Sequence, residues 1–353
     1  MSVNKILAVI RGEWADKKIP VLATVVSVEG SSYRAPGAVL LVDSSQAYLG
    51  MISGGCLEPA IMEIARTLGT RKGVLRWFDL KDDSVWGLGM GCGGMVGVYL
   101  EPICEDRNWS LWVRAIEKKE AVGRVVVYET ENSSISEGST LVTSDRGMSI
   151  GTTGNSELDS RLRAELKILM GQPESVSRDI KIGPVRALLD VVWPPPRLVI
   201  FGAGGDAMPV ADLAVKTGFK TLIVDDRQEL ATKQRFPVAN LNHSTSEEYP
   251  DLDLGGQDYV VIMHHHLGKD AAALKTALNA RVYYVGLLGP ESRFEKIKRH
   301  IVNQGQDLEA SDIARIDTPI GLDIGAQGPD EIALSIVSGL LAVRRLGRKD
   351  RLL

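Results

Sequence analysis

A glycine-rich loop in the second half of the chain has the composition to hold a phosphate-bearing cofactor. Gly202, Gly204, Gly205 and Ala207 lie in a G-x-G-x-x-A pattern that directly follows the apolar run at residues 198–201. In such a pattern the first glycine permits a tight turn and the second lets the backbone approach a pyrophosphate. The small third residue lets the following helix pack closely on the strand. The start of that helix would offer free N–H groups to the anion.

Two acidic residues follow at the position where dinucleotide-binding domains contact a ribose. Asp225 and Asp226 end the next apolar run, where an acidic side chain would meet a ribose hydroxyl of NAD(P). Strand, loop, helix and acidic ending together predict the opening of a Rossmann-type domain at residues 197–226. The plainer alternative is that the glycines serve only turn geometry and packing, and that the aspartates bind no ribose.

A cysteine directly preceded by two glycines is the main chemical feature of the first half. Ser53, Gly54, Gly55 and Cys56 stand between a predicted strand and a predicted helix. A thiol at a helix N-terminus is exposed to the helix dipole and to free amides, which lower its pKa and favour anions. We therefore expect Cys56 to be a functional thiol and its neighbours to contact a cofactor.

A second cysteine lies in an even more glycine-rich segment. Cys92 is flanked by Gly91 and Gly93, so that a ligand could approach the backbone without obstruction by side chains. The alternative for each loop cysteine is a small buried hydrophobic residue beside a turn. Cys104 lies outside any such loop and is expected to be structural. The spacing of Cys56 and Cys92 matches neither a zinc ribbon nor a CxxC motif, which disfavours structural zinc.

Basic and imidazole side chains occur in two further loops. Arg34 lies in the hydroxyl-rich loop at residues 30–37 and could grip an oxyanion bidentately, although a polar hairpin loop is the alternative. His264, His265 and His266 end a predicted strand on the side where open α/β sheets bind ligands. On an extended backbone His264 and His266 would share a face and His265 would oppose them. No acidic residue lies at matching spacing, so we expect a polar loop beside the cofactor pocket, with His265 as a candidate ligand contact.

Two turn-like segments fall at the same predicted end of the sheet. One contains Gly286 and Gly289 and is followed by Arg293; the other spans residues 319–325. In open α/β sheets the loops at the carboxyl ends of the strands line the ligand crevice. We therefore expect Gly286, Gly289 and Arg293 to belong to the same cofactor site.

The pattern of elements predicts two domains of different class. Residues 1–192 mix amphipathic helices with β-rich segments, and no internal repeat is evident. The sequence W-P-P-P at residues 193–196 stiffens the chain into an extended linker. In residues 197–353 strands and helices alternate, which predicts a parallel sheet covered on both faces. The expected fold is α/β, with a Rossmann-like doubly wound sheet at the C-terminal end and a mixed α+β domain before it.

Composition limits the environment and the partners. The 353 residues carry a net charge of −4, which argues against broad electrostatic binding to nucleic acid or an anionic membrane. The first residues lack the uninterrupted apolar region of a signal peptide, and no apolar run is long enough for a membrane span. Three cysteines fit a reducing compartment better than a disulfide framework. We expect a cytoplasmic protein that forms a homo-oligomer.

Several long motifs together resemble one known family. GSSYRAPG, SGGCLE, WGLGMGCGG, PPPRLVIFGAGG, GLLGPESR and PIGLDIGAQGPDEIA occur in this order. The chain resembles the XdhC/CoxI family, accessory proteins of xanthine dehydrogenase and related molybdenum hydroxylases, over almost its whole length. Two positions depart from the family pattern. Members often have a histidine where this chain has Gly205, and they commonly read Thr-His-Asp or Thr-His-Asn at residues 264–266, so that His265 keeps the shared position.

The resemblance implies a maturation role rather than catalysis. Such proteins bind molybdenum cofactor (molybdopterin), favour its sulfuration together with a cysteine desulfurase, and deliver it to an apo-enzyme. By resemblance, the cysteine-bearing loops are those of Cys56 and Cys92, and either thiol could contact molybdenum. One alternative is an NAD(P)-dependent oxidoreductase with a loop cysteine as nucleophile or redox thiol, although no His–carboxylate relay supports it. Another is a partner-docking protein whose glycine loops serve only architecture.

Overall fold

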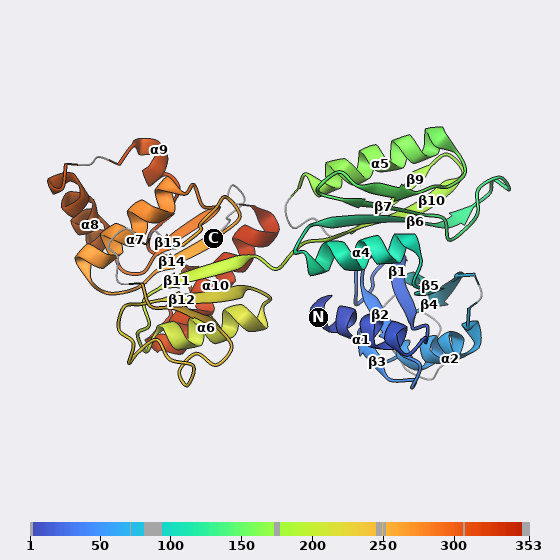
Figure 1. Cartoon of the computed structure of the whole chain (residues 1–353), viewed down its shortest axis with the longest axis horizontal. Coiled ribbons are helices and arrows are strands. Elements are labelled where there is room, and N and C mark those ends of the chain that lie inside the picture. The colour runs from blue at the N-terminus through green and yellow to red at the C-terminus, as the bar shows by residue number, and fades with distance from the viewer. Residues whose placement is uncertain are drawn as a thin grey trace. The chain divides into compact units, whose positions relative to one another are not determined.

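The computed structural model describes residues 3–70, 72–80, 94–172, 177–244, 249, 252–305 and 308–347. The predicted loop contacts Gly91, Cys92 and Gly93 lie outside these residues. The chain forms two compact units, Met1–Pro194 and Pro195–Leu353 (Figure 1). No helix in the described part of the chain has both the length and the apolar composition needed to cross a bilayer.

Unit 1 begins with an antiparallel sheet and two helices. Its strands run in the spatial order β3-β2-β1-β5-β4. In chain order the elements are α1 (Val3–Ala15), β1 (Val21–Glu29), β2 (Val39–Val42), β3 (Tyr48–Gly50), α2 (Glu58–Leu68), β4 (Val74–Asp79) and β5 (Met95–Pro102).

The rest of unit 1 repeats this arrangement. A second antiparallel sheet has the order β8-β7-β6-β10-β9, which is the order of the first sheet with each strand number raised by five. The expectation that the chain has no internal repeat is therefore wrong at the level of topology. The elements are α4 (Arg107–Glu117), β6 (Val122–Thr130), β7 (Thr140–Ser144), β8 (Ser149–Gly151), α5 (Ser156–Met170), β9 (Ser177–Ile182) and β10 (Val185–Val192).

Matching turns support the duplication in unit 1. The Gly37 N–H donates to the Val25 carbonyl at 2.8 Å, and the Gly138 N–H donates to the Val127 carbonyl at 2.7 Å. Both glycines have positive φ angles, of 90° and 85°. Glycine adopts this region without the steric cost that a Cβ would add. The two halves thus share a bond pattern even where their sequences have diverged.

Unit 1 buries its apolar residues on both faces of each sheet. The helix α2 covers one face of the first sheet, and α5 covers one face of the second (Figure 1). The helices α1 and α4 form a shared core with residues of β1, β2, β6 and β7. A small cluster that includes Val26, Tyr99 and Tyr128 joins the inner faces of the two sheets. The loops of this unit that carry predicted site residues therefore project from a well-packed scaffold.

Unit 2 is a doubly wound parallel sheet. Its strand order is β13-β12-β11-β14-β15-β16, the order of a dinucleotide-binding Rossmann fold. The strands are β11 (Arg197–Phe201), β12 (Lys220–Val224), β13 (Asn240–Asn242), β14 (Tyr259–Ile262), β15 (Tyr284–Leu287) and β16 (Ile316–Asp317). The longer helices are α6 (Ala207–Lys216), α7 (Leu267–Asn279), α8 (Glu291–Asn303) and α10 (Gly328–Leu346), and α9 (Ala310–Ile313) is a short turn.

Successive residues of the central strands are buried on opposite faces. Leu198 and Ile200 pack with α6 and α10, whereas Val199 and Phe201 pack with α7 and α8 (Figure 1). Burial on both faces explains why these strands are continuous apolar runs. The predicted α/β class, with a Rossmann-like C-terminal sheet and an α+β first half, is confirmed.

Candidate functional site

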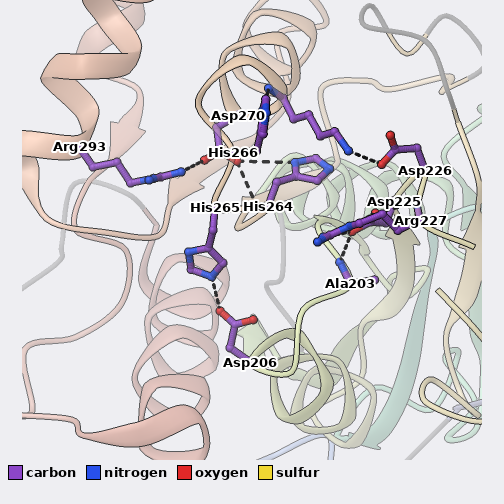
Figure 2. Close-up of polar contacts among 11 residues, drawn as sticks. Ala203, Asp206, Asp225, Asp226, Arg227, His264, His265, His266, Asp270 and Arg293 are labelled. Carbon is purple, nitrogen blue, oxygen red and sulfur yellow. Dashed lines mark hydrogen bonds and ion pairs between the residues drawn. The ribbon is translucent and has the colours of Figure 1, made fainter. Parts of the chain in front are cut away.

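The topological switch point of unit 2 lies between β11 and β14. Chain order runs outward from β11 on one side and from β14 on the other, so the loops after these strands flank the position at which this fold has its ligand crevice. The glycine loop follows β11, and the three histidines follow β14. Figure 2 shows polar side chains from both loops directed toward one another.

The glycine loop meets the geometric demands of the fold. Gly202 has a φ angle of +121°, and a Cβ there would lie 2.5 Å from the Met263 carbonyl oxygen of the neighbouring strand end. Only glycine fits this position. Ala207 is fully buried against the sheet, as the small third residue of the motif should be. By contrast, a Cβ on Gly205 would meet nothing within 4 Å.

Asp225, expected at a ribose hydroxyl, is bound internally. Its carboxylate is fully buried and accepts the Ala203 N–H at 2.7 Å, the Arg227 N–H at 3.0 Å and the Arg227 guanidinium at 2.7 and 2.9 Å (Figure 2). Burial alone would raise the pKa of Asp225, but the hydrogen bonds from Arg227 and Ala203 outweigh it and hold the pKa far below that of a free aspartate. The carboxylate thus fixes the glycine loop to the end of β12.

Asp226 lies at the surface of the same strand end. Its half-exposed carboxylate forms an ion pair with Lys269 of α7 (Figure 2). An exposed pair of this kind contributes little to stability. Asp226 therefore remains accessible to a ligand in a way that Asp225 does not.

The three histidines point in different directions. The backbone is not extended through them as expected, because His265 has a φ angle of +60°. The His264 side chain is buried, with its backbone N–H donating to Asp270 at 3.1 Å. The exposed His265 ring is 2.6 Å from an Asp206 carboxylate oxygen. His266 caps α7 by accepting the Lys269 N–H.

A buried carboxylate joins three of the elements around the crevice. Asp270 in the first turn of α7 forms an ion pair with Arg293 of α8 and lies beside the His264 ring (Figure 2). Burial would raise the pKa of Asp270, but these partners hold it below its ordinary value. Arg293, predicted to contact a cofactor, thus has a protein partner. Gly289 has a φ angle of +125°, and a Cβ there would overlap the Arg293 side chain.

The remaining predicted glycine of this unit serves close packing. A Cβ on Gly286, in β15, would overlap the side chain of Ile320 in the loop after β16. Gly286 therefore allows that loop to cross closely over the strand. Close packing is the role that the structure shows for Gly286.

In unit 1 the predicted site residues gather at one edge of the first sheet. Because β1 pairs antiparallel with β2 and β5, the end of β1, the starts of β2 and β5 and the ends of β3 and β4 share this edge. The loops at residues 30–37 and 51–57 leave the sheet here. Leu80 and Gly94, which flank the segment containing Cys92, meet through a 2.9 Å hydrogen bond. We call this edge, with residues 30–37, 51–57, Leu80 and Gly94, the glycine–cysteine end.

Cys56 lies in a turn that is fixed from within. The buried Glu58 carboxylate accepts the N–H groups of Ile52 and Ser53 at 3.2 and 3.0 Å and the Ser53 hydroxyl. The Ser53 oxygen accepts the N–H groups of Gly55 and Leu57 at 3.2 and 3.0 Å. Burial would raise the pKa of Glu58, but these hydrogen bonds hold it below its ordinary value. The predicted contact Ser53 is therefore a structural residue of this loop.

The second half of unit 1 has a matching turn without a cysteine. There Asp159 accepts the N–H and the hydroxyl of Thr153 at 2.8 and 2.6 Å, just as Glu58 does for Ser53. A hydroxyl–carboxylate pair thus stabilises the connection from β3 to α2 and the matching connection from β8 to α5. What the first half adds is the half-buried, free thiol of Cys56 beside the exposed Gly54 and Gly55.

The other candidates in unit 1 differ in exposure. Arg34 is exposed, and its guanidinium lies over the Tyr33 ring without an ion pair to any described residue. Cys104 lies just after β5, where burial and the nearby Asp106 raise the pKa of its thiol. A raised pKa favours the unreactive thiol form, in keeping with the structural role expected for Cys104.

Comparison with known proteins identifies the family. The model of the XdhC Rossmann domain matches residues 198–340, and the model of the XdhC and CoxI family matches residues 14–77. The chain belongs to the XdhC and CoxI family. Both the glycine loop of unit 2 and the SGGC turn of unit 1 lie within the matched residues.

Relatives that match almost the whole XdhC/CoxI chain are described as xanthine dehydrogenase proteins or as a molybdenum cofactor insertion chaperone. A Bacillus subtilis protein, described as a probable subunit of xanthine dehydrogenase, is 28% identical, with 94% of each chain covered. The molybdenum cofactor insertion chaperone PaoD of Escherichia coli is 23% identical over 94% of this chain and 85% of its own. A crystal structure described as a xanthine dehydrogenase from Bacillus halodurans matches with a TM-score of 0.79 and 28% identity, covering 100% of this chain and 98% of that one.

Among its described residues, the glycine–cysteine end offers one thiol, Cys56, and no ready metal cage. Among the described residues no group of three or more His, Cys, Asp or Glu side chains could enclose a metal ion. Cys56 can supply one sulfur ligand, and a Cβ at Gly54 or Gly55 would meet nothing within 4 Å. The turn therefore fits a metal that brings most of its own ligands, as a pterin-bound molybdenum does.

Sequence reasoning missed three residues of the unit 2 site. Asp206, Arg227 and Asp270 make its principal polar contacts. Asp206 occupies a variable position of the glycine motif, and the other two lie outside it. Asp270 had one usable signal, since an acidic residue in the first turn of a helix is favoured by the helix dipole. Nothing in the spacing indicated the partners of Asp206 or Arg227.

Proposed function

We propose that this chain is a maturation chaperone that binds molybdenum cofactor, supports its sulfuration and promotes its insertion into a xanthine dehydrogenase-like molybdenum hydroxylase. Family membership and the names of the full-length relatives support this assignment. The observation that carries it is the half-buried, free Cys56 thiol, presented by a rigid turn beside open glycine backbone.

The chain's own residues would bind and orient the cofactor at the glycine–cysteine end. The Cys56 sulfur, as thiolate, is the soft donor suited to molybdenum, and Cys92 on the neighbouring segment is a second candidate. Arg34 is exposed and carries a planar guanidinium that matches a phosphate bidentately. Gly54 and Gly55 leave the backbone open to a flat pterin ring. The cofactor, once delivered, supplies the molybdenum centre of the client enzyme.

Two macromolecular partners follow from this proposal. An apo-form molybdenum hydroxylase would receive the cofactor, and a cysteine desulfurase would supply the sulfur. The persulfide of the desulfurase would be the source of the sulfur that the mature cofactor carries. The role of this chain would be to hold and orient the cofactor while the desulfurase acts on it, without itself supplying sulfur.

The alternative, an NAD(P)-dependent oxidoreductase, rests on the strand order and glycine loop of unit 2. Against it, the carboxylate that should meet a ribose hydroxyl is bound to Ala203 and Arg227. The maturation role is therefore the better supported of the two.

Co-expression with a client enzyme tests the maturation role. A xanthine dehydrogenase is produced in a host lacking its own accessory protein, with and without this chain, and purified. We expect several-fold higher specific activity with the chain, together with a higher content of cyanide-releasable sulfur per molybdenum. Equal activity and equal sulfur content in the two preparations would exclude the proposed role.

A further inference from the structure

The glycine loop of unit 2 is covered by one of its own side chains. Gly204 is the second glycine of the motif, the position that lets a pyrophosphate approach the backbone. A Cβ built on Gly204 would overlap the Asp206 Oδ1 atom. The Asp206 carboxylate therefore folds back over Gly204, into the space that a pyrophosphate would require.

His265 holds this carboxylate from the other side of the switch point. Its Nε2 atom lies 2.6 Å from the second carboxylate oxygen of Asp206, and Figure 2 shows the two side chains meeting between the loops after β11 and β14. The left-handed backbone of His265 is uncommon for a residue other than glycine. Such strain persists only where the surrounding structure enforces it. Both strand-end loops thus contribute to the position of the carboxylate.

The second dinucleotide contact of the fold is also occupied. Asp225 is bound to Ala203 and Arg227, so that it offers no free oxygen to a ribose. The hydrogen bond that it accepts from the Ala203 N–H joins the end of β12 to the glycine loop. The switch point therefore has the strand order and glycine loop of a dinucleotide site. However, Gly204 and Asp225, which would contact the dinucleotide, are in contact with other residues of the chain.

We propose that Asp206 is a specificity-determining residue whose carboxylate, positioned by His265, excludes the pyrophosphate of NAD and NADP from the glycine loop. A diphosphate at Gly204 would place negative charge against a carboxylate, and like charges brought together in this way disfavour binding. Asp206 and His265 both belong to unit 2. The exclusion of dinucleotides therefore goes beyond the proposed maturation role and does not depend on it.

Dinucleotide binding to three purified full-length variants tests the proposal. Asp206→Asn keeps the shape of the side chain and removes its charge. Asp212→Asn removes the same charge from an exposed position on α6 and is the matched control. His265→Ala removes the partner and leaves the carboxylate. Binding of NAD, NADP and ADP-ribose is measured by calorimetry, and folding is checked by thermal unfolding.

The Asp206→Asn protein should gain the most affinity. We expect it to bind ADP-ribose and NAD at least about tenfold more tightly than the unmodified chain. The Asp212→Asn protein should show no gain, because the charge over Gly204 remains. The His265→Ala protein should show a smaller gain than Asp206→Asn, because the carboxylate loses the partner that positions it but keeps its charge. Tight NAD binding by the unmodified chain would overturn the proposal. So would a folded Asp206→Asn protein that binds no more tightly than the control.

Discussion

Replacing Asp225 by asparagine is expected to lower the free energy of unfolding by about 3 kcal/mol at neutral pH. The carboxylate is fully buried and accepts hydrogen bonds from Ala203 and from both the backbone and the guanidinium of Arg227. Asparagine removes the charge and turns an N–H₂ group toward one of these donors. The glycine loop would then lose its tie to the end of β12.

Urea unfolding followed by circular dichroism measures this loss. Asp226→Asn is the matched control, because its half-exposed ion pair with Lys269 should contribute less than about 1 kcal/mol. Since the pKa of Asp225 is lowered in the folded state, its stabilisation is present above the unfolded pKa of about 3.9 and is lost as the pH falls below it. The difference between the unmodified and Asp225→Asn proteins should therefore shrink on acidification. Equal losses in the two variants would contradict this account of Asp225.

Replacing Cys56 by serine is expected to reduce activation of a co-expressed molybdenum hydroxylase by more than about tenfold, because serine lacks the sulfur donor proposed to hold the molybdenum. The fold should survive. Cys56 is half-buried at the rim of the core of the first sheet, and the turn around it is held by Ser53 and Glu58. The measurement is the specific activity of the purified client, with thermal unfolding of the chaperone as a check.

Cys104→Ser provides the control for loss of a thiol as such. Cys104 is also free and half-buried, but it lies away from the glycine–cysteine end. Cys92→Ser is tested alongside, because the two loop thiols are alternative ligands. If Cys56→Ser and Cys92→Ser both leave client activation at the level of Cys104→Ser, the loop cysteines are structural and the site lies elsewhere.

The Rossmann half could be predicted closely because its strands are buried on both faces. Such strands are continuous apolar runs, and short loops separate them from amphipathic helices. The turn at Gly202 could also be predicted from the glycine motif. The structure gives the physical reason for this glycine, because the close approach of Met263 leaves no room for a Cβ. Polar strands were harder to find. The strand β7, which reads TLVTS, and the three-residue strand β8 were missed, and with them the duplication in unit 1.

Side-chain partners were the least predictable part of the site. An aspartate at the end of a parallel strand has the same sequence signature whether it faces a ribose or, as Asp225 does, its own glycine loop. The partners of Asp206 and Asp270 come from elements 59 and 23 residues away. Their pairing depends on how α7 and α8 pack against the sheet, which local periodicity does not specify. The turn around Cys56 was found because its glycines and thiol are contiguous.

A parallel binding measurement tests the central claim most directly. The purified full-length chain is mixed separately with free molybdenum cofactor and with NAD, then passed through a desalting column, and retained pterin and nucleotide are quantified. The proposed function predicts retention of pterin in near-stoichiometric amount, reduced in the Cys56→Ser protein, and no retention of NAD. Retention of NAD with no retention of pterin would contradict it.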